Sequence, residues 1–311
     1  MKVVKLLLLS VLLGVLAAAV AAGASSQQLA ESGHCQEALP LLKADLAKAT
    51  GAEQKRLGAD GVRCGMTLDD LDAALDFLRV LDKNFPSDPE VLYLATHVFS
   101  DLSIRASHRL MLLGPSSYQV HELNAEAMET QGKWSEAEAE YREVLKKDPQ
   151  VPGIHYRIAR LLLSAPPAGS TADVKTGARR ELEEELKIDP RNAAAECILG
   201  ELDRQDGKDT VAIEHFSRAT KLDGGFEDAY IGLGRTLLSE DRAADAIPPL
   251  EIAVKLDPDS PVAHFNLATA YSRMGRKEDA AREFNRLKLV SEKLKQTNQQ
   301  VREGIAGAPP Q

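Results

Sequence analysis

Apolar residues recur at intervals of three and four along most of this chain, and charged residues fill many positions between them. In residues 36–49, for instance, Ala38, Leu42 and Leu46 share one face of a helix. Helices are expected to end where prolines cluster, as at residues 85–89, because proline cannot continue a helix. The pattern predicts early helices over residues 26–32, 36–49, 53–64, 68–85, 90–100, 102–113, 120–130 and 135–147.

Two of these expectations concern local details. Residues 90–100 and 102–113 are expected to form a helical pair with a shortened turn between them. Ser135 is expected to cap the amino end of helix 135–147, since serine side chains accept hydrogen bonds from the first turn.

One landmark repeats with a nearly constant period. An alanine stands at Ala137, Ala178, Ala212, Ala246 and Ala280, and the successive differences in residue number are 41, 34, 34 and 34. A fixed period in this range indicates a solenoid, in which each unit cannot bury its apolar face alone. The clearest copy runs from Glu227 to Pro258, and the excess length of one unit falls in the turn-rich stretch 164–171.

Residues 1–24 are typical of a secretory signal peptide. Lys2 and Lys5 precede an apolar run from Leu6 to Val20, and small residues follow, so cleavage is expected after Ala24. The alternative is an N-terminal membrane anchor, because the run approaches the length that spans a bilayer. The absence of a cysteine directly after the run disfavours a lipid anchor.

The charge and composition narrow the classes of partner. The net charge is −9, and removal of the signal would leave 36 basic against 47 acidic residues, a net charge of −11. This balance argues against nucleic acid, which needs a basic footprint. Aromatic residues make up only 5% of the chain, which suits closely packed helices rich in alanine and leucine.

Three cysteines follow the signal. Cys35 is expected to start one helix and Cys64 to end the next, which places them level in an antiparallel hairpin, so a Cys35–Cys64 disulfide is predicted. The alternative is that both are unpaired core residues. Cys197 is then the odd cysteine.

No catalytic, metal-binding or cofactor-binding motif is evident. The seven histidines have no zincin spacing, and the chain contains no paired CxxC motifs, phosphate-binding glycine loop or Gly-x-Ser-x-Gly elbow. His121, His155 and His264 fall at equivalent points of the repeat and are expected to pack between repeats. The sequence therefore predicts a protein that is not an enzyme and that holds no metal or cofactor.

The repeated residues resemble those of the tetratricopeptide repeat, a helix–turn–helix unit of about 34 residues. The matching sets are Leu199-Gly200 with Ala212-x3-Phe216, Tyr230-x2-Leu233-Gly234, and His264-x2-Leu267-Ala268-x2-Tyr271 with Ala280-x3-Phe284, closed by Pro149, Pro190 and Pro258. Gly224 stands where one closing proline would be. The resemblance is strong over residues 118–287 and weak over 25–115.

The resemblance implies an all-α solenoid, a right-handed superhelix of about seven helix–turn–helix units with a C-terminal capping helix. The expected divisions are a signal peptide (1–24), divergent N-terminal hairpins (25–115), a regular array (116–287), a capping helix extension (288–302) and a disordered tail (303–311). The polar residues after Leu287 are typical of the cap that a solenoid end needs.

The resemblance also implies a concave groove lined by the first helices of the repeats. Its predicted partner-binding residues are Tyr156, Arg160, Glu201, Arg204, Ile231, Arg235, Phe265, Asn266 and Arg273, with Glu122, Glu126, Cys197 and Thr269 beside them. The arginines are expected either to contact carboxylates of a peptide or to pair with Glu126 and Glu201 as ordinary surface salt bridges.

The sequence thus favours a scaffold of the bacterial cell envelope that binds a protein or peptide segment, is exported to the periplasm or beyond, and does not insert into the membrane once its signal is removed. The alternative is a structural assembly subunit that uses its convex face or self-association.

Overall fold

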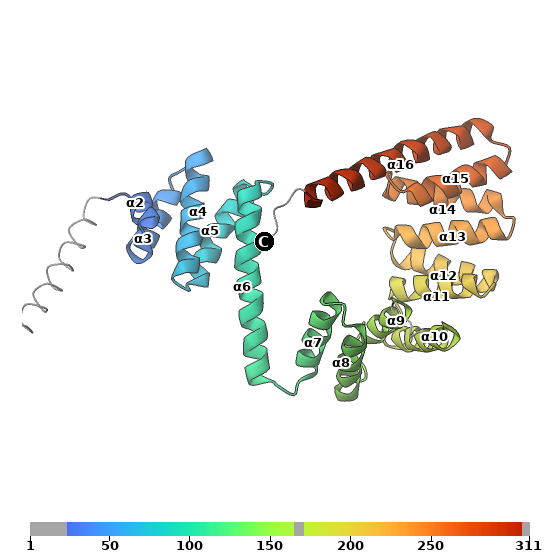
Figure 1. The fold of residues 1–311 in the computed structure, drawn as a ribbon, viewed down its shortest axis with the longest axis horizontal. Helices are drawn as coiled ribbons and strands as arrows, with labels where there is room; N and C mark the ends of the chain where they lie inside the picture. The colour runs from blue at the N-terminus through green and yellow to red at the C-terminus, as the bar shows by residue number, and fades with distance from the viewer. Residues whose placement is uncertain (1–23, 165–170, 307–311) are drawn as a thin grey trace, which may run out of the picture. The chain divides into compact units, whose positions relative to one another are not determined.

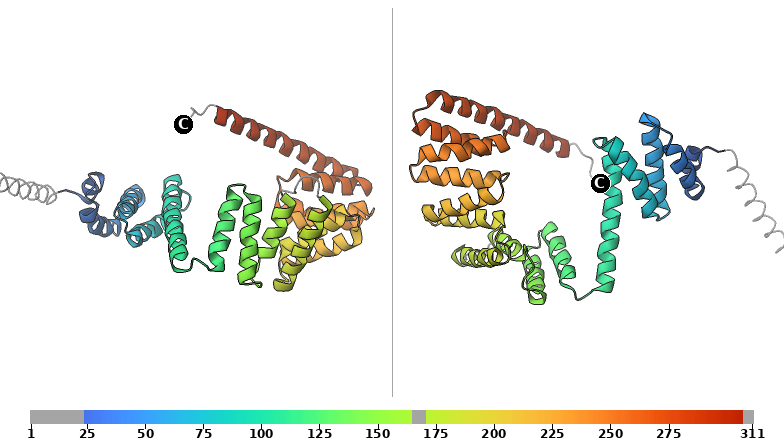
Figure 2. Two further views of the ribbon diagram at one scale, coloured as in Figure 1. Left: turned by 60° about the horizontal axis from the view of Figure 1, so that its bottom comes forward. Right: turned by 180° about the vertical axis from the view of Figure 1, so that it is seen from behind.

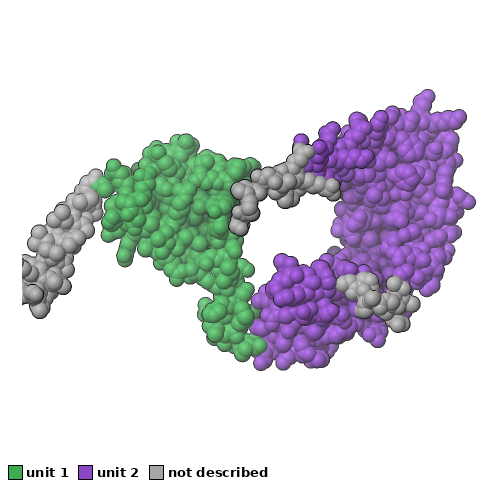
Figure 3. Space-filling model, in the orientation of Figure 1, with its two compact units in different colours: residues 1–115 green, residues 116–311 purple. Residues whose placement is uncertain are grey.

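The structure is a computed structural model that describes residues 24–164 and 171–306. Within these residues it contains fifteen helices and no strand, so the chain is an all-α protein, as predicted (Figure 1). The helices form two compact units that divide between Pro115 and Ser116 (Figure 3). All but the last residue of the predicted signal peptide lie outside the described residues.

Over residues 24–115, unit 1 contains five helices. They are α2 (Ser26–Glu31), α3 (Cys35–Leu46), α4 (Gly51–Thr67), α5 (Leu71–Asn84) and α6 (Pro89–Leu113). Helix α4 turns a small-residue face toward α5: a Cβ at Gly61 would lie 2.3 Å from the ring of Phe77, and one at Gly65 would lie 2.6 Å from the backbone nitrogen of Ala74. Glycine therefore allows the two helices to approach more closely than any larger residue would.

A disulfide joins α3 to α4. Cys35 is the first residue of α3 and Cys64 lies in the last turn of α4, and their Cα atoms are 5.0 Å apart. The bond closes the hairpin between these helices at the positions that the sequence predicts. Both cysteines are buried in the core of unit 1 with Leu42, Val62 and Phe77.

Helix α6 differs from the prediction of two short helices. It is one continuous helix of 25 residues, because the stretch around Asp101 contains neither proline nor glycine to end it. Only its first half is well packed, through Val91, Leu94 and Val98. Several large apolar residues along α6 are exposed: Leu92, Tyr93, Phe99, Ile104, Met111, Leu112 and Leu113.

Unit 2 consists of five helical hairpins that follow one another in chain order (Figures 1 and 2). They are α7 (Tyr118–Thr130) with α8 (Trp134–Lys147), α9 (Ile154–Ser164) with α10 (Thr171–Ile188), α11 (Ala193–Gln205) with α12 (Asp209–Leu222), α13 (Glu227–Ser239) with α14 (Ala243–Leu256), and α15 (Pro261–Arg273) with α16 (Lys277–Ala306). Each hairpin carries one of the five landmark alanines in its second helix, and all five are buried. The predicted insert in the second hairpin falls largely on residues 165–170, outside the described residues.

A left-handed backbone residue closes the turn of each of the last three hairpins. Gly207, Asp241 and Gly275 recur with the same period as the landmark alanines of these hairpins and have φ values of 71°, 56° and 72°. Glycine adopts this conformation without strain, and aspartate is one of the few other residues that tolerates it. The repeat is thus maintained in the backbone as well as in the core.

Two local predictions in unit 2 are wrong. Ser135 lies inside α8 rather than at its cap, because the helix begins at Trp134 after Lys133, which makes no side-chain capping bond. Helix α16 continues to Ala306, so residues 303–306 are helical rather than part of a disordered tail. The rest of that tail lies outside the described residues.

Candidate binding groove

A hollow of about 580 Å³ crosses the first helices of three successive hairpins, α11, α13 and α15. Its floor is apolar and is formed by Cys197, Ile198, Phe216, Ile231 and Val262. The three helices can lie side by side because the repeat places them at the same point of each hairpin. The hollow is therefore a product of the stacking itself.

The floor is fixed by close packing around Phe216. This side chain is 1% exposed and comes from α12, behind the first helices. A Cβ at Gly232 would lie 2.3 Å from the ring, and one at Gly200 would lie 3.0 Å from it. Because the two glycines leave room for it, the ring fills the space between the third and fourth hairpins and supports the floor.

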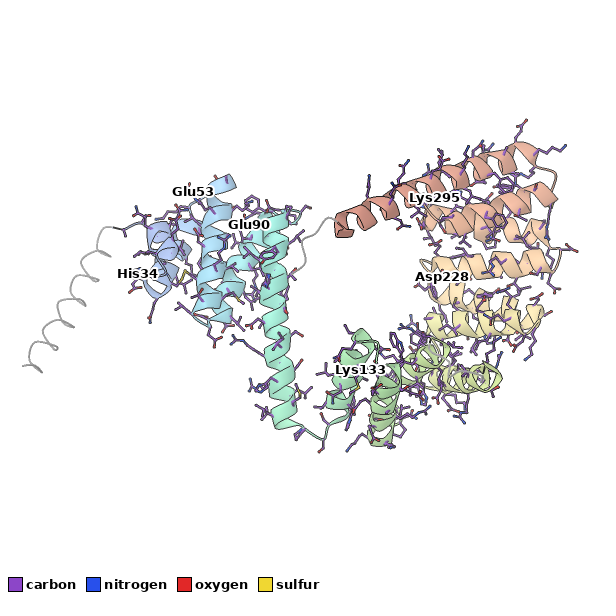
Figure 4. All side chains as sticks on the ribbon, in the orientation of Figure 1. His34, Glu53, Glu90, Lys133, Asp228 and Lys295 are labelled. Atoms are coloured by element: carbon purple, nitrogen blue, oxygen red, sulfur yellow. A yellow bond between two sulfur atoms is a disulfide. The ribbon has the colours of Figure 1, made fainter. Side chains whose placement is uncertain are left out.

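The polar rim is mostly acidic. Four carboxylates line the hollow, those of Glu201, Glu227, Asp228 and Asp257, against the single guanidinium of Arg235. Figure 4 labels Asp228, which lies in the first turn of α13. The rim therefore carries an excess of negative charge.

Only one of the four carboxylates is neutralised by a salt bridge to a described residue. Glu201 accepts hydrogen bonds from Arg204 at 2.6 and 2.9 Å, whereas Glu227, Asp228 and Asp257 have no ion pair within residues 24–164 and 171–306. The side chain of Arg235 also has no hydrogen-bond partner among these residues. These charged groups remain available to a ligand.

The carboxylates of the rim affect the ionisation of Cys197 in the floor of the hollow. Burial, together with the carboxylates of Asp228 and Glu201, raises the pKa of the Cys197 thiol to about 12. The thiol is therefore protonated at neutral pH and is a poor nucleophile, since the thiolate is the reactive form.

Comparison with known proteins identifies the repeat. Sequence profiles of the tetratricopeptide repeat match residues 123–166 and 237–293, which lie in the first two and the last two hairpins of unit 2. The chain is a tetratricopeptide-repeat protein. None of the curated protein sequences compared matches it.

Solved structures were found to be similar, and one of them reaches a TM-score of 0.50. A double mutant of MamA, described as MamA RS-1 ArsTM, is 18% identical, with a TM-score of 0.50 over 57% of this chain and 96% of its own. Another crystal structure of MamA is 23% identical, with a TM-score of 0.48 over 55% of this chain and 96% of its own. YrrB, described as a TPR protein with an unusual peptide-binding site, is 16% identical, with a TM-score of 0.48 over 60% of this chain and 92% of its own.

The structure brings some of the predicted groove residues together. Glu201, Ile231, Arg235 and Cys197 line the hollow of the tetratricopeptide array. Phe265 lies on α15 outside its lining and is 53% exposed.

Other predicted residues are engaged in the fold of the tetratricopeptide array. Arg160 lies over the ring of Tyr156, 5.7 Å from its centroid. Arg273 donates to the carbonyl of Leu238 at 2.5 Å, and Asn266 donates to the carbonyl of Val262 at 2.7 Å. With Arg204 held by Glu201, only Arg235 of the four arginines makes no contact of this kind with the described residues.

The sequence projection included Glu201 but missed the other three carboxylates of the rim and part of the floor. It used positions in the middle of each first helix, whereas Glu227, Asp228 and Val262 lie in the first turns of α13 and α15. Asp257 ends α14, in the turn before α15. The sequence did contain an indication of the acidic rim, because acidic residues stand at the start of α13 and before α15.

The equivalent histidines do not simply pack between repeats, as the sequence suggested. Each bonds through Nδ1 to a glutamate in the second helix of its own hairpin: His121 to Glu140 at 2.7 Å, His155 to Glu181 at 2.7 Å and His264 to Glu283 at 2.6 Å. In the third hairpin the two residue types are exchanged, and Glu196 bonds to His215 at 2.6 Å. The histidines thus join the two helices of a hairpin.

The part of the chain that the structure describes offers neither a metal site nor a membrane-spanning helix. They contain no group of three or more histidine, cysteine, aspartate or glutamate side chains placed to hold a metal ion. None of their helices has both the length and the apolar character needed to cross a membrane.

Proposed function

We propose that this tetratricopeptide-repeat protein is a scaffold that binds a segment of a partner protein in the hollow across α11, α13 and α15. The observation that carries the proposal is an apolar floor, open to solvent, on three helices held in place by the stacked hairpins. Binding requires no covalent step. A surface that is already formed loses little conformational freedom when a segment docks.

The floor and Arg235 suggest how a segment would be held. Burying one leucine-sized side chain on Ile231 and Val262 contributes about 1.5–3 kcal/mol. The unpaired guanidinium of Arg235 can donate hydrogen bonds to backbone carbonyls of the segment, and such bonds fix its direction along the groove.

A pair of matched variants tests the site. Val262 is exposed and lines the hollow, whereas Val211 is exposed on α12 and does not line it. Peptides are first selected on the full chain from a displayed library of random sequences, and their affinities for Val262→Trp and Val211→Trp are then compared. We expect Val262→Trp to block binding and Val211→Trp to leave it unchanged. Equal effects of the two variants would remove the groove from the proposal and favour the assembly alternative.

We also propose that the protein acts in the cell envelope after export. The sequence of residues 1–24 and the Cys35–Cys64 disulfide support this, because disulfides persist in oxidising compartments. Amino-terminal sequencing of the protein from fractionated cells tests it: a periplasmic protein that starts at Ser25 is expected. An intact N-terminus in the membrane fraction would favour the anchor, and an intact protein in the cytosol would refute export.

A further inference from the structure

We propose that the hollow selects basic segments, in which an aliphatic side chain is flanked by lysine or arginine. The inference rests on the proposed function and adds the chemistry of the partner to it. It runs against one of the two alternatives that the sequence left open, in which arginines of the groove would contact carboxylates of the partner.

The charges of the rim carry the inference. Glu227, Asp228 and Asp257 have no ion pair among the described residues, and they come from two places, the start of α13 and the turn before α15. Unpaired carboxylates around an apolar floor attract cations and repel a second acidic chain. A segment with basic residues on either side of an aliphatic one matches both features.

Helix stability accounts for only part of this arrangement. Glu227 and Asp228 lie in the first turn of α13, where acidic residues favourably meet the helix dipole. Asp257 does not, because it ends α14. Among the described residues its Oδ1 accepts a hydrogen bond only from the amide of Asp259, at 2.9 Å. The dipole therefore does not explain why three carboxylates converge on one hollow.

An acidic partner would find few cations in the groove. Arg204 is bonded to Glu201, and Arg273 is bonded to the carbonyl of Leu238. This leaves Arg235, which is surrounded by the acidic rim and whose charge helps to lower the pKa of Glu201 against the effect of burial. One guanidinium among four carboxylates does not favour a negatively charged ligand.

Three synthetic peptides of equal length test the inference on the full chain by fluorescence anisotropy. The first has a central leucine flanked by lysines, the second has the same leucine flanked by glutamates, and the third has a central serine flanked by lysines. We expect the first to bind at least roughly tenfold more tightly than either of the others, with an affinity that falls as salt screens the charges.

A charge-neutral variant localises the effect. The triple variant Glu227→Gln, Asp228→Asn and Asp257→Asn removes the three charges. The substitution Asp257→Asn keeps a side-chain oxygen that can accept the hydrogen bond from the amide of Asp259. Binding of the first peptide to this variant should weaken roughly tenfold. The control is Glu136→Gln, Glu240→Gln and Glu278→Gln, which changes the net charge equally at exposed sites outside the hollow. It should bind the peptide as the parent chain does.

The outcomes separate the inference from the proposed function. Equal loss in both triple variants, or equal binding of the lysine and glutamate peptides, would overturn the basic preference. If library peptides without basic residues bind and are blocked by Val262→Trp, the groove stands and only the inference fails. If no selected peptide is sensitive to Val262→Trp, both fail.

Discussion

Replacement of Gly234 by alanine tests the packing on which the array depends. A Cβ at this position would lie 2.4 Å from Cγ of Leu250, which is fully buried, so the leucine cannot simply move away. Overpacking by one methyl group costs about 1–3 kcal/mol. Alanine recovers about 1 kcal/mol through its higher helix propensity. A net loss of about 1 kcal/mol is therefore expected.

Gly177 provides the matched control in the same unit. A Cβ there meets only Cδ1 of Leu162 at 3.6 Å, an ordinary contact, so Gly177→Ala should stabilise by up to about 1 kcal/mol. Because the propensity term is common to both variants, the difference between them, about 1–3 kcal/mol, measures the steric clash. Helicity followed by circular dichroism during urea unfolding gives the midpoints to compare.

A double variant sharpens the test. Leu250→Ala alone should cost about 2–5 kcal/mol because it leaves a cavity. Its cost should be smaller in the Gly234→Ala background, since the new methyl group occupies part of the space that Leu250 leaves. Two results would refute the close contact between α13 and α14: Gly234→Ala stabilises the chain as much as Gly177→Ala does, or the free-energy changes of Gly234→Ala and Leu250→Ala are fully additive in the double variant.

Three further predictions concern the cysteines and one buried carboxylate. Replacing Cys35 by serine removes the Cys35–Cys64 disulfide, which restricts the unfolded chain, and should destabilise unit 1 by about 3 kcal/mol. An unchanged urea midpoint for the unfolding of unit 1 would contradict this. Cys197 should resist iodoacetamide at about pH 8 in the folded chain and react after denaturation, since its pKa is raised to about 12; fast labelling when folded would refute the burial. Burial would raise the pKa of Glu196, but bonds from His215 and Arg218 outweigh it, and the pKa lies below the ordinary 4.5. The stability that the ionised Glu196 contributes is therefore complete above about pH 4.5 and is lost as the pH falls through its pKa in the folded chain. The difference in urea midpoint between the parent chain and Glu196→Gln should shrink between about pH 6 and pH 3. A constant difference would refute the pairing of Glu196 with His215 and Arg218.

The repetitive part of the fold could be predicted from the sequence because the two helices of each hairpin pack against each other at equivalent positions. The landmark alanines and Gly234 must be small wherever two helices approach closely, and that requirement recurs at a fixed period. The continuity of α6 through Asp101 could not be predicted in this way. Exposed apolar residues such as Phe99 and Ile104 look the same in a sequence whether a helix turns back between them or continues.

The candidate site was only partly predictable for a related reason. The resemblance to the tetratricopeptide repeat pointed to the face that carries Ile231 and Arg235, and both residues line the hollow. It could not show that Arg204 is neutralised by Glu201, because the partner of a charged side chain depends on rotamers and distances. It also gave no weight to Asp257, which lies in a turn rather than on a helical face.

Cross-linking from the ligand tests the central claim most directly. The basic peptide is synthesised with a photoreactive leucine analogue at its centre, bound to the full chain, irradiated and mapped by mass spectrometry. The account predicts cross-links to the floor of the hollow, at Ile198, Ile231 or Val262. Cross-links confined to residues of α12 and α14 that do not line the hollow, or to unit 1, would contradict it.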